Sequence, residues 1–96
     1  MENLDELKKL TKYLQDNNYI VHTYDEYHPY GRHSVAVFNS DGECLWDAIC
    51  QYGSYGYERG LLEIAGNIMT DKERESDIVA GCLTADEIIK RLEKWT

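Results

Sequence analysis

The sequence contains no hydrophobic run long enough to cross a membrane and only one proline. No apolar stretch approaches the roughly 20 residues that a membrane-spanning helix needs, and the start MENLDELKK lacks the apolar core of a signal peptide. A single proline among 96 residues, with 43% hydrophobic residues, is typical of an ordinary folded chain rather than a disordered one. We therefore expect one domain over residues 1–96, cytoplasmic and without a membrane partner.

Cysteine is also scarce, and its spacing argues against the common cysteine-based sites. Cys44, Cys50 and Cys82 are odd in number and far apart, which suits reduced thiols better than a disulfide framework. Neither a CxxC nor an HxxxH pair is present, so the cysteines and the three histidines do not match the ligand spacing of a zinc site. We predict no metal site and no cofactor.

Basic residues are almost absent from the middle of the chain. The formal net charge is -8, and between Tyr13 and Glu58 seven acidic residues and all eight tyrosines accompany a single base, Arg32. Direct nucleic-acid binding is not expected, because neutralising phosphates requires clustered lysine and arginine. A basic protein partner suits this acidic, tyrosine-rich block better.

The first half of the chain predicts one helix followed by three strands. Leucines at helical intervals favour a helix over residues 4–15, and Asn3 and Glu6 have the spacing of a capping box. Asp41-Gly42 between two β-type runs indicates a hairpin. The three runs rich in β-branched and aromatic residues are YIVHTY, HSVAVF and ECLWDAIC.

The second half predicts a loop, QYGSYGYERG, and two helices. LLEIAGNIM places Leu61, Ile64, Ala65 and Ile68 on one helical face, and DKERESD is polar enough for an exposed connection. Thr84 and Glu87 form a capping box that opens a last helix over residues 85–94. The predicted fold is α+β, with a three-stranded antiparallel sheet packed by helices in the order α-β-β-β-α-α.

Two patterns are candidates for catalytic or ligand sites. A cysteine beside a histidine would give a thiol nucleophile, but Cys44 and Cys50 lie six residues apart in a predicted strand and are expected to face its core side. GSYGYERG matches neither common phosphate-binding pattern and lacks the required lysine. A small thiol-dependent enzyme is the least favoured interpretation, and we predict that the protein is not an enzyme.

The segments WDAICQYGSYGYERGLLEIAG and GCLTADEIIKRL resemble a group of small proteins from phages and prophages of Gram-positive bacteria. The resemblance covers residues 46–92. That group has no established activity, so the resemblance implies a mobile-element origin and a bacterial cytoplasm and supplies no catalytic residues. Small acidic phage proteins include inhibitors of host defence nucleases, some of which occupy a nucleic-acid channel.

The charge pattern and this resemblance together lead to one hypothesis and one alternative. We expect a non-enzymatic acidic module that binds or inhibits a basic host protein, in the manner of a nucleic-acid mimic. The alternative is a structural or assembly protein that self-associates through its aromatic side chains, most simply as a homodimer. The predicted contacts are Asp25, Glu26, Tyr27, Tyr30, Asp41, Glu43, Tyr55 and Tyr57.

Overall fold

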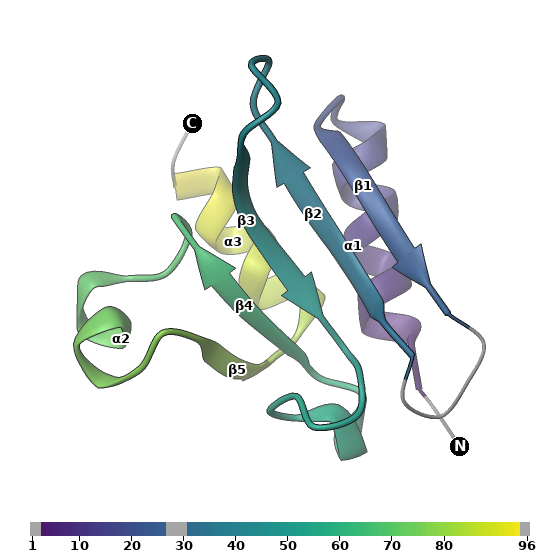
Figure 1. The fold of residues 1–96 in the computed structure, drawn as a ribbon, viewed down its shortest axis with the longest axis vertical. Helices are drawn as coiled ribbons and strands as arrows, with labels where there is room; N and C mark the ends of the chain where they lie inside the picture. Colours follow the sequence, from purple (N-terminus) through teal and green to yellow (C-terminus); the bar gives the residue numbers. More distant parts are fainter. Residues whose placement is uncertain (1–2, 27–30, 95–96) are drawn as a thin grey trace.

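A computed structural model describes residues 3–26 and 31–94 of the chain. It is an α+β fold, as predicted, but its sheet has five strands instead of three. Figure 1 shows the arrangement. The elements are α1 (Asp5–Asp16), β1 (Ile20–Asp25), β2 (His33–Phe38), β3 (Cys44–Ile49), the 3-10 turn η1 (Tyr57–Arg59), β4 (Leu62–Gly66), α2 (Asp71–Ser76), β5 (Ala80–Leu83) and α3 (Ala85–Lys94).

The strands follow one another across the sheet in chain order, β1-β2-β3-β4-β5, and each is antiparallel to the next. Helices α1 and α3 lie side by side behind this sheet, and α2 lies beyond its β4–β5 side (Figure 1). In the described part of the chain, no helix covers the face turned away from α1 and α3. We call this surface the open face.

The core lies between the sheet and the two long helices. Alternate strand residues point toward the helices, so Val35, Ala48 and Ile64 form one row across β2, β3 and β4 and are fully buried. Leu10 of α1 and Ile88 of α3 are also fully buried. One face of the sheet is therefore apolar and packed, which leaves the other face to carry polar groups.

Contacts at the start of α1 fasten that helix to α3. The carboxylate of Glu6 accepts a hydrogen bond from the backbone N–H of Ala85 at 2.7 Å, and Lys9 pairs with Asp86 at 3.0 Å. The predicted Asn3/Glu6 capping box is therefore wrong: Leu4 occupies the N-cap without a side-chain hydrogen bond. Glu6 instead accepts a hydrogen bond from an N–H group that has no partner within α3, at the start of that helix, where a negative charge is favoured.

The helix predicted over residues 61–69 is wrong, because this segment contains β4. Leu62 and Ile64 point into the core, and Glu63 points to the open face, which is the alternation of a strand. Gly66 has φ of +110°, and a Cβ there would lie 2.5 Å from the Leu45 carbonyl oxygen. Close backbone packing of two strands explains the glycine that a helix would not favour.

The polar run over residues 71–77, predicted as a connection, forms α2 and precedes the unpredicted strand β5. A capping box closes its start, since Thr70 and Glu73 bond each other's backbone N–H groups. Glu73 also accepts two hydrogen bonds from the Arg91 guanidinium, at 2.6 and 2.7 Å. Arg91 holds the pKa of Glu73 down at about 2, chiefly through these hydrogen bonds.

Three local predictions are confirmed. The hairpin at Asp41-Gly42 joins β2 and β3, with Gly42 at φ of +85°. The capping box of Thr84 and Glu87 is present, with the Glu87 N–H donating to Thr84 Oγ1 at 3.2 Å. The final helix spans Ala85–Lys94, as predicted.

Candidate functional site

Two carboxylates on neighbouring strands mark the centre of the open face. Asp47 on β3 pairs in register with Ala65 of β4, and Glu63 on β4 pairs with Ile49 of β3, so the two acids are diagonal neighbours. Small, polar and aromatic side chains surround them across the sheet, together with one large apolar side chain, Ile49. The two rows of the open face are Tyr24, Ser34, Ile49 and Glu63, and His22, Ala36, Asp47 and Ala65.

Asp47 is half-buried although it lies on this uncovered surface. Burial raises the pKa of its carboxyl, the nearby Glu63 carboxylate raises it further, and the Arg32 guanidinium lowers it in part. A carboxylate with a raised pKa is short of stabilising positive charge or hydrogen-bond donors. Asp47 and Glu63 therefore place negative charge at the centre of the open face that Arg32 offsets only in part.

Arg32 supplies a positive charge to the open face, but an aromatic ring holds it to one side. Its guanidinium carbon lies 3.8 Å from the centroid of the Tyr24 ring, in cation–π geometry. The His22 ring contacts the same tyrosine edge-on, with centroids 4.7 Å apart. The β1 side of the open face is thus an ordered aromatic and cationic border next to the acids.

Tyr55 forms the opposite border. Its backbone N–H donates to Glu63 Oε1 at 3.0 Å, and its carbonyl accepts from the N–H of Cys82 at 3.2 Å. A Cβ on Gly81 would meet the Tyr55 Cβ at 2.3 Å, so the glycine is what lets the loop lie this close to β5. The Tyr55 residue is 56% exposed. The predicted contact Tyr55 therefore lies beside the acidic centre.

Asp41 and Glu43, two further predicted contacts, lie in the β2–β3 hairpin. Asn39 Oδ1 accepts the backbone N–H of both residues, at 2.9 and 3.0 Å, and both side chains are exposed. Ordered in this way, the turn presents two carboxylates at one end of the sheet.

Asp25 and Glu26 lie at the other end of β2, where β1 finishes. Asp25 Oδ1 lies 2.9 Å from Nδ1 of the buried His33, so its carboxylate already has a partner. Six residues of strand separate this pair from the hairpin, a length of about 20 Å. The predicted acids therefore form two groups rather than one, with Asp47 and Glu63 between them.

The remaining predicted contacts divide between the loop and the undescribed segment. Tyr57 is partly buried against the core, and its ring contacts Tyr52 edge-on at 6.3 Å. Tyr27 and Tyr30 lie outside the described residues. Of the four predicted tyrosines, Tyr55 is the one that the described structure presents as an exposed ring.

The charge of the molecule is distributed unevenly between its two sides. Helix α1 contains three acidic and three basic residues, and α3 contains the same numbers. Residues 17–70, which form the first four strands and their loops, contain seven acidic and two basic residues. The helical layer is therefore neutral, and the sheet with its loops carries most of the negative charge.

Sequence reasoning missed Asp47 and Glu63 as site residues. LWDAIC does not alternate in polarity, whereas in LLEIAG the polar Glu63 and the small Ala65 alternate with large apolar residues. The second string also fits a helical face, and the helical interpretation placed Glu63 on a helix. Strand assignment of both segments would have brought these two acids to one face.

The cysteines do not share one environment. Cys50 is fully buried, as expected, but Cys44 is exposed, so the prediction that both face the core is wrong. A register shift between Val37 and Phe38 places an extra residue in β3 at this point, and such a bulge redirects the side chains beside it. Cys82 is exposed, with φ of +59°.

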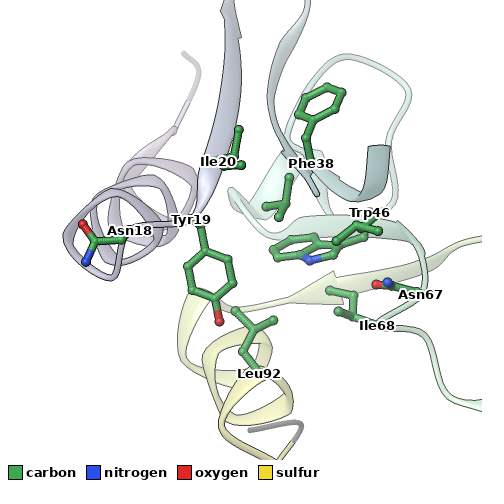
Figure 2. Close-up of a pocket in the computed structure, with 10 residues that line it drawn as sticks. Asn18, Tyr19, Ile20, Phe38, Trp46, Asn67, Ile68 and Leu92 are labelled. Carbon is green, nitrogen blue, oxygen red and sulfur yellow. The ribbon is translucent and has the colours of Figure 1, made fainter. Parts of the chain in front are cut away.

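A separate apolar pocket of about 340 Å³ opens at the hairpin end, between the sheet and α3. Figure 2 shows Tyr19, Trp46, Ile68 and Leu92 around it. Asn67 also lines the pocket, and its Oδ1 is buried without a hydrogen-bond partner. The pocket is distinct from the open face and has little polar lining.

Neither a metal cluster nor a membrane-spanning helix occurs in the described residues. No group of three histidine, cysteine or acidic side chains in residues 3–26 and 31–94 is arranged to hold a metal ion. No helix within those ranges has the length and apolar character to cross a bilayer. No family model, curated protein or solved structure matches the chain.

Proposed function

We propose that the protein is a non-enzymatic acidic module that binds a basic partner protein through its open face. The observation that carries this proposal is the pair Asp47 and Glu63, which no helix of the described chain covers. The raised pKa of Asp47, caused by burial and by Glu63, marks a place where an incoming lysine or arginine would be stabilised. The proposed function thus depends on a surface whose negative charges are only partly offset by positive ones.

The surrounding surface supports the same partner chemistry. Tyrosine contributes large contact area with a polar tip, and Tyr24 and Tyr55 flank the acids on the two sides. Asp41 and Glu43 at one end, and Glu26 at the other, extend the negative surface beyond the centre. The basic residues of α1 and α3 lie in the layer behind the sheet (Figure 1), away from this surface.

A nucleic-acid-binding host protein is the partner class that this surface would suit best. The carboxylates lie along the sheet and at its two ends, over a length of about 20 Å. The phosphates of a nucleic acid also form a series of negative charges along such a length. The module would then occupy the basic groove of its partner and inhibit it. The resemblance to phage proteins makes a bacterial defence protein a reasonable host target.

The test is the binding of a labelled octalysine peptide, measured by fluorescence anisotropy at low salt. Asp47→Asn with Glu63→Gln should weaken binding several-fold, because both local charges are removed while the new amide oxygen at position 63 can still accept the Tyr55 N–H. The matched control is Asp71→Asn with Glu75→Gln on α2, which removes the same net charge elsewhere. Equal weakening by the two double variants would refute a localised site.

The salt dependence of octalysine binding is a second test of the proposal. Raising the ionic strength from about 0.1 M to about 1 M shortens the Debye length from roughly 10 Å to roughly 3 Å. Binding of the unmodified protein should weaken steeply over this range, and the Asp47→Asn, Glu63→Gln variant should show a shallower dependence. Binding that is independent of salt would contradict the proposal.

A further inference from the structure

Strand β1 has an edge whose backbone groups have no partner among the residues that the structure describes. The N–H of Glu26 donates to the Arg32 carbonyl at 2.9 Å, so this residue pair is a hydrogen-bonded pair of the β1–β2 ladder. Alternate pairs bond in an antiparallel ladder, which directs the N–H and C=O groups of Val21, Thr23 and Asp25 away from β2. Within residues 3–26 and 31–94, no hydrogen bond engages these outward groups.

The opposite edge of the sheet, formed by β5, is protected against the addition of a further strand. Strand β5 has four residues and a register shift, and its Cys82 N–H already donates to the Tyr55 carbonyl at 3.2 Å. Strand β1 has six residues and contains no proline, lysine or register shift. Short length, bulges, lysine, proline and inward-pointing charges are the usual means of preventing a further strand from pairing, and β1 has one of these, Asp25 at its end.

A groove runs beside the β1 edge, between that strand and α1. Its volume is about 280 Å³, and the lining includes Leu4, Leu7, Lys8, Thr11, Thr23 and Asp25. Leu7 is buried and Leu4 is half-buried, so the base of the groove is apolar. The side chains of Val21, Thr23 and Asp25 face the helix side of the sheet, so a strand added here would send alternate side chains toward this groove.

We propose that the β1 edge and this groove bind an extended segment of a partner protein by strand addition. The segment pairs antiparallel to β1 as a sixth strand, inserts an apolar side chain over Leu4 and Leu7, and places an acidic side chain near Lys8. Addition of a peptide to a sheet edge, with pockets for alternate side chains, is a recurrent mode of peptide recognition. This site is independent of the open face, and its partner has the opposite charge.

The acidic residue in the segment follows from the lysines on α1. Lys9 pairs with Asp86 at 3.0 Å, and Lys12 pairs with Asp16 at 2.6 Å. Lys8 lines the groove and forms no ion pair with any residue that the structure describes. Its ammonium group is therefore available to a carboxylate of the bound segment.

A second copy of this chain is a poorer occupant of the edge. In a symmetric antiparallel pair of β1 strands centred on His22, Asp25 of one copy would lie opposite Tyr19 of the other. Tyr19 follows the end of α1 at Asp16, so this Asp25 would lie near that end of the helix, about two turns from Lys8. A second copy would therefore not place a carboxylate next to Lys8.

The test begins with selection of random dodecapeptides, displayed on phage, against the full chain. We expect enriched peptides to alternate apolar residues and to contain an acidic residue. Synthetic versions should protect the amides of Val21, Thr23 and Asp25 from hydrogen exchange. Failure to enrich any peptide, or enrichment of peptides that protect other amides instead, would overturn the proposal.

Two variants identify the interactions. Thr23→Pro removes an outward N–H without removing a β1–β2 bond, and should weaken peptide binding about tenfold. Lys8→Glu should weaken it about threefold, on the scale of an exposed ion pair. The matched control Lys90→Glu, an equal charge change at an exposed site on α3, should leave binding unchanged. If circular dichroism shows that Thr23→Pro does not fold, the test rests on the difference in peptide binding between Lys8→Glu and Lys90→Glu.

Two further outcomes separate this inference from its competitors. Protection of the β1 edge without peptide, together with a dimer mass by light scattering, would overturn it in favour of a second copy. The Asp47→Asn, Glu63→Gln variant should bind the selected peptides as tightly as the unmodified chain does. Loss of peptide binding in that variant would place the peptides on the open face and contradict a separate edge site.

Discussion

The two sides of this molecule satisfy their charges in different ways. On the helical side, acids and bases are equal in number on α1 and α3, and Lys9–Asp86 and Arg91–Glu73 pair across elements. On the open face, Asp47 and Glu63 lie beside each other, and Arg32 offsets them only in part. The difference teaches that net charge alone does not show where negative charge is offset by neighbouring groups and where it is offset only in part.

The same contrast applies to packing. The helical side buries Leu7, Leu10 and Leu14 of α1 against the sheet, while on the open face Ala36 is buried among its neighbours and Ala65 is partly exposed. Apolar burial stabilises the first side. The second side contributes less to that core.

The largest expected difference is between substitutions on the two sides of the sheet. Leu10→Ala should destabilise the fold by about 3 kcal/mol, because it leaves a cavity at a fully buried position. Ile49→Ala on the open face should cost about 1 kcal/mol or less, because that side chain is only partly buried. Urea unfolding followed by circular dichroism measures both. Equal losses would show that the open face is packed as tightly as the core.

The second prediction concerns the pair that fastens α2 to α3. Glu73→Gln should cost about 1–2 kcal/mol, less than a fully buried charged hydrogen bond because 26% of the Glu73 side chain is exposed. Since the pKa of Glu73 is lowered to about 2, its contribution is complete above the ordinary value of 4.5 and is lost as the pH falls toward 2.

Unfolding measured across that pH range checks the linkage. The variant should lose less stability on acidification than the unmodified protein does. Glu75→Gln, two residues further along α2 and exposed, is the matched control and should behave like the unmodified chain. A Glu73→Gln profile parallel to the unmodified one would contradict the role given to Arg91.

The smallest expected effect has the opposite sign. The pKa of Asp47 is raised by burial and by Glu63, so the folded state favours its protonated form, and stability is lost as the pH rises through that raised pKa. Asp47→Asn should therefore stabilise the protein near neutral pH, by about 0.5 kcal/mol on the scale of surface substitutions. The two proteins should become equally stable in acid.

Thermal unfolding at several pH values measures this difference. Asp41→Asn removes the same charge from the exposed hairpin and is the control for a general change in net charge. Destabilisation by Asp47→Asn near neutral pH would mean that the carboxylate already has a stabilising partner. The open face would then lack the incompletely offset negative charge that a partner's lysine or arginine would bind.

Local signals in the sequence were sufficient for about half of the fold. The capping box at Thr84 and Glu87 and the turn at Asp41-Gly42 act through neighbouring residues, so they can be recognised without knowledge of the rest of the structure. The helix predicted over residues 61–69 failed because its apolar residues fit both a 3.6-residue and a 2-residue period. Pairing of β4 with β3 decided between them, and that contact is not local.

The candidate site was predicted less well than the fold. The acidic, tyrosine-rich block was recognised from the sequence, and Glu26, Asp41, Glu43 and Tyr55 lie at the ends or border of the open face. Asp25 instead faces the helix side of the sheet. Which acids are neighbours depends on strand register, and an unrecognised β4 hid the pair of Asp47 and Glu63. A bulge in β3 likewise exposed Cys44, which strand parity alone would have buried.

The most direct test of the account is to map where a basic ligand binds. Amide chemical shifts of the isotope-labelled chain would be recorded during titration with octalysine at low salt. The account predicts that the shifts concentrate on β3, β4 and Tyr55, around Asp47 and Glu63, and that α1 and α3 change little. Shifts concentrated on the helices, or spread evenly over all exposed acids, would contradict it.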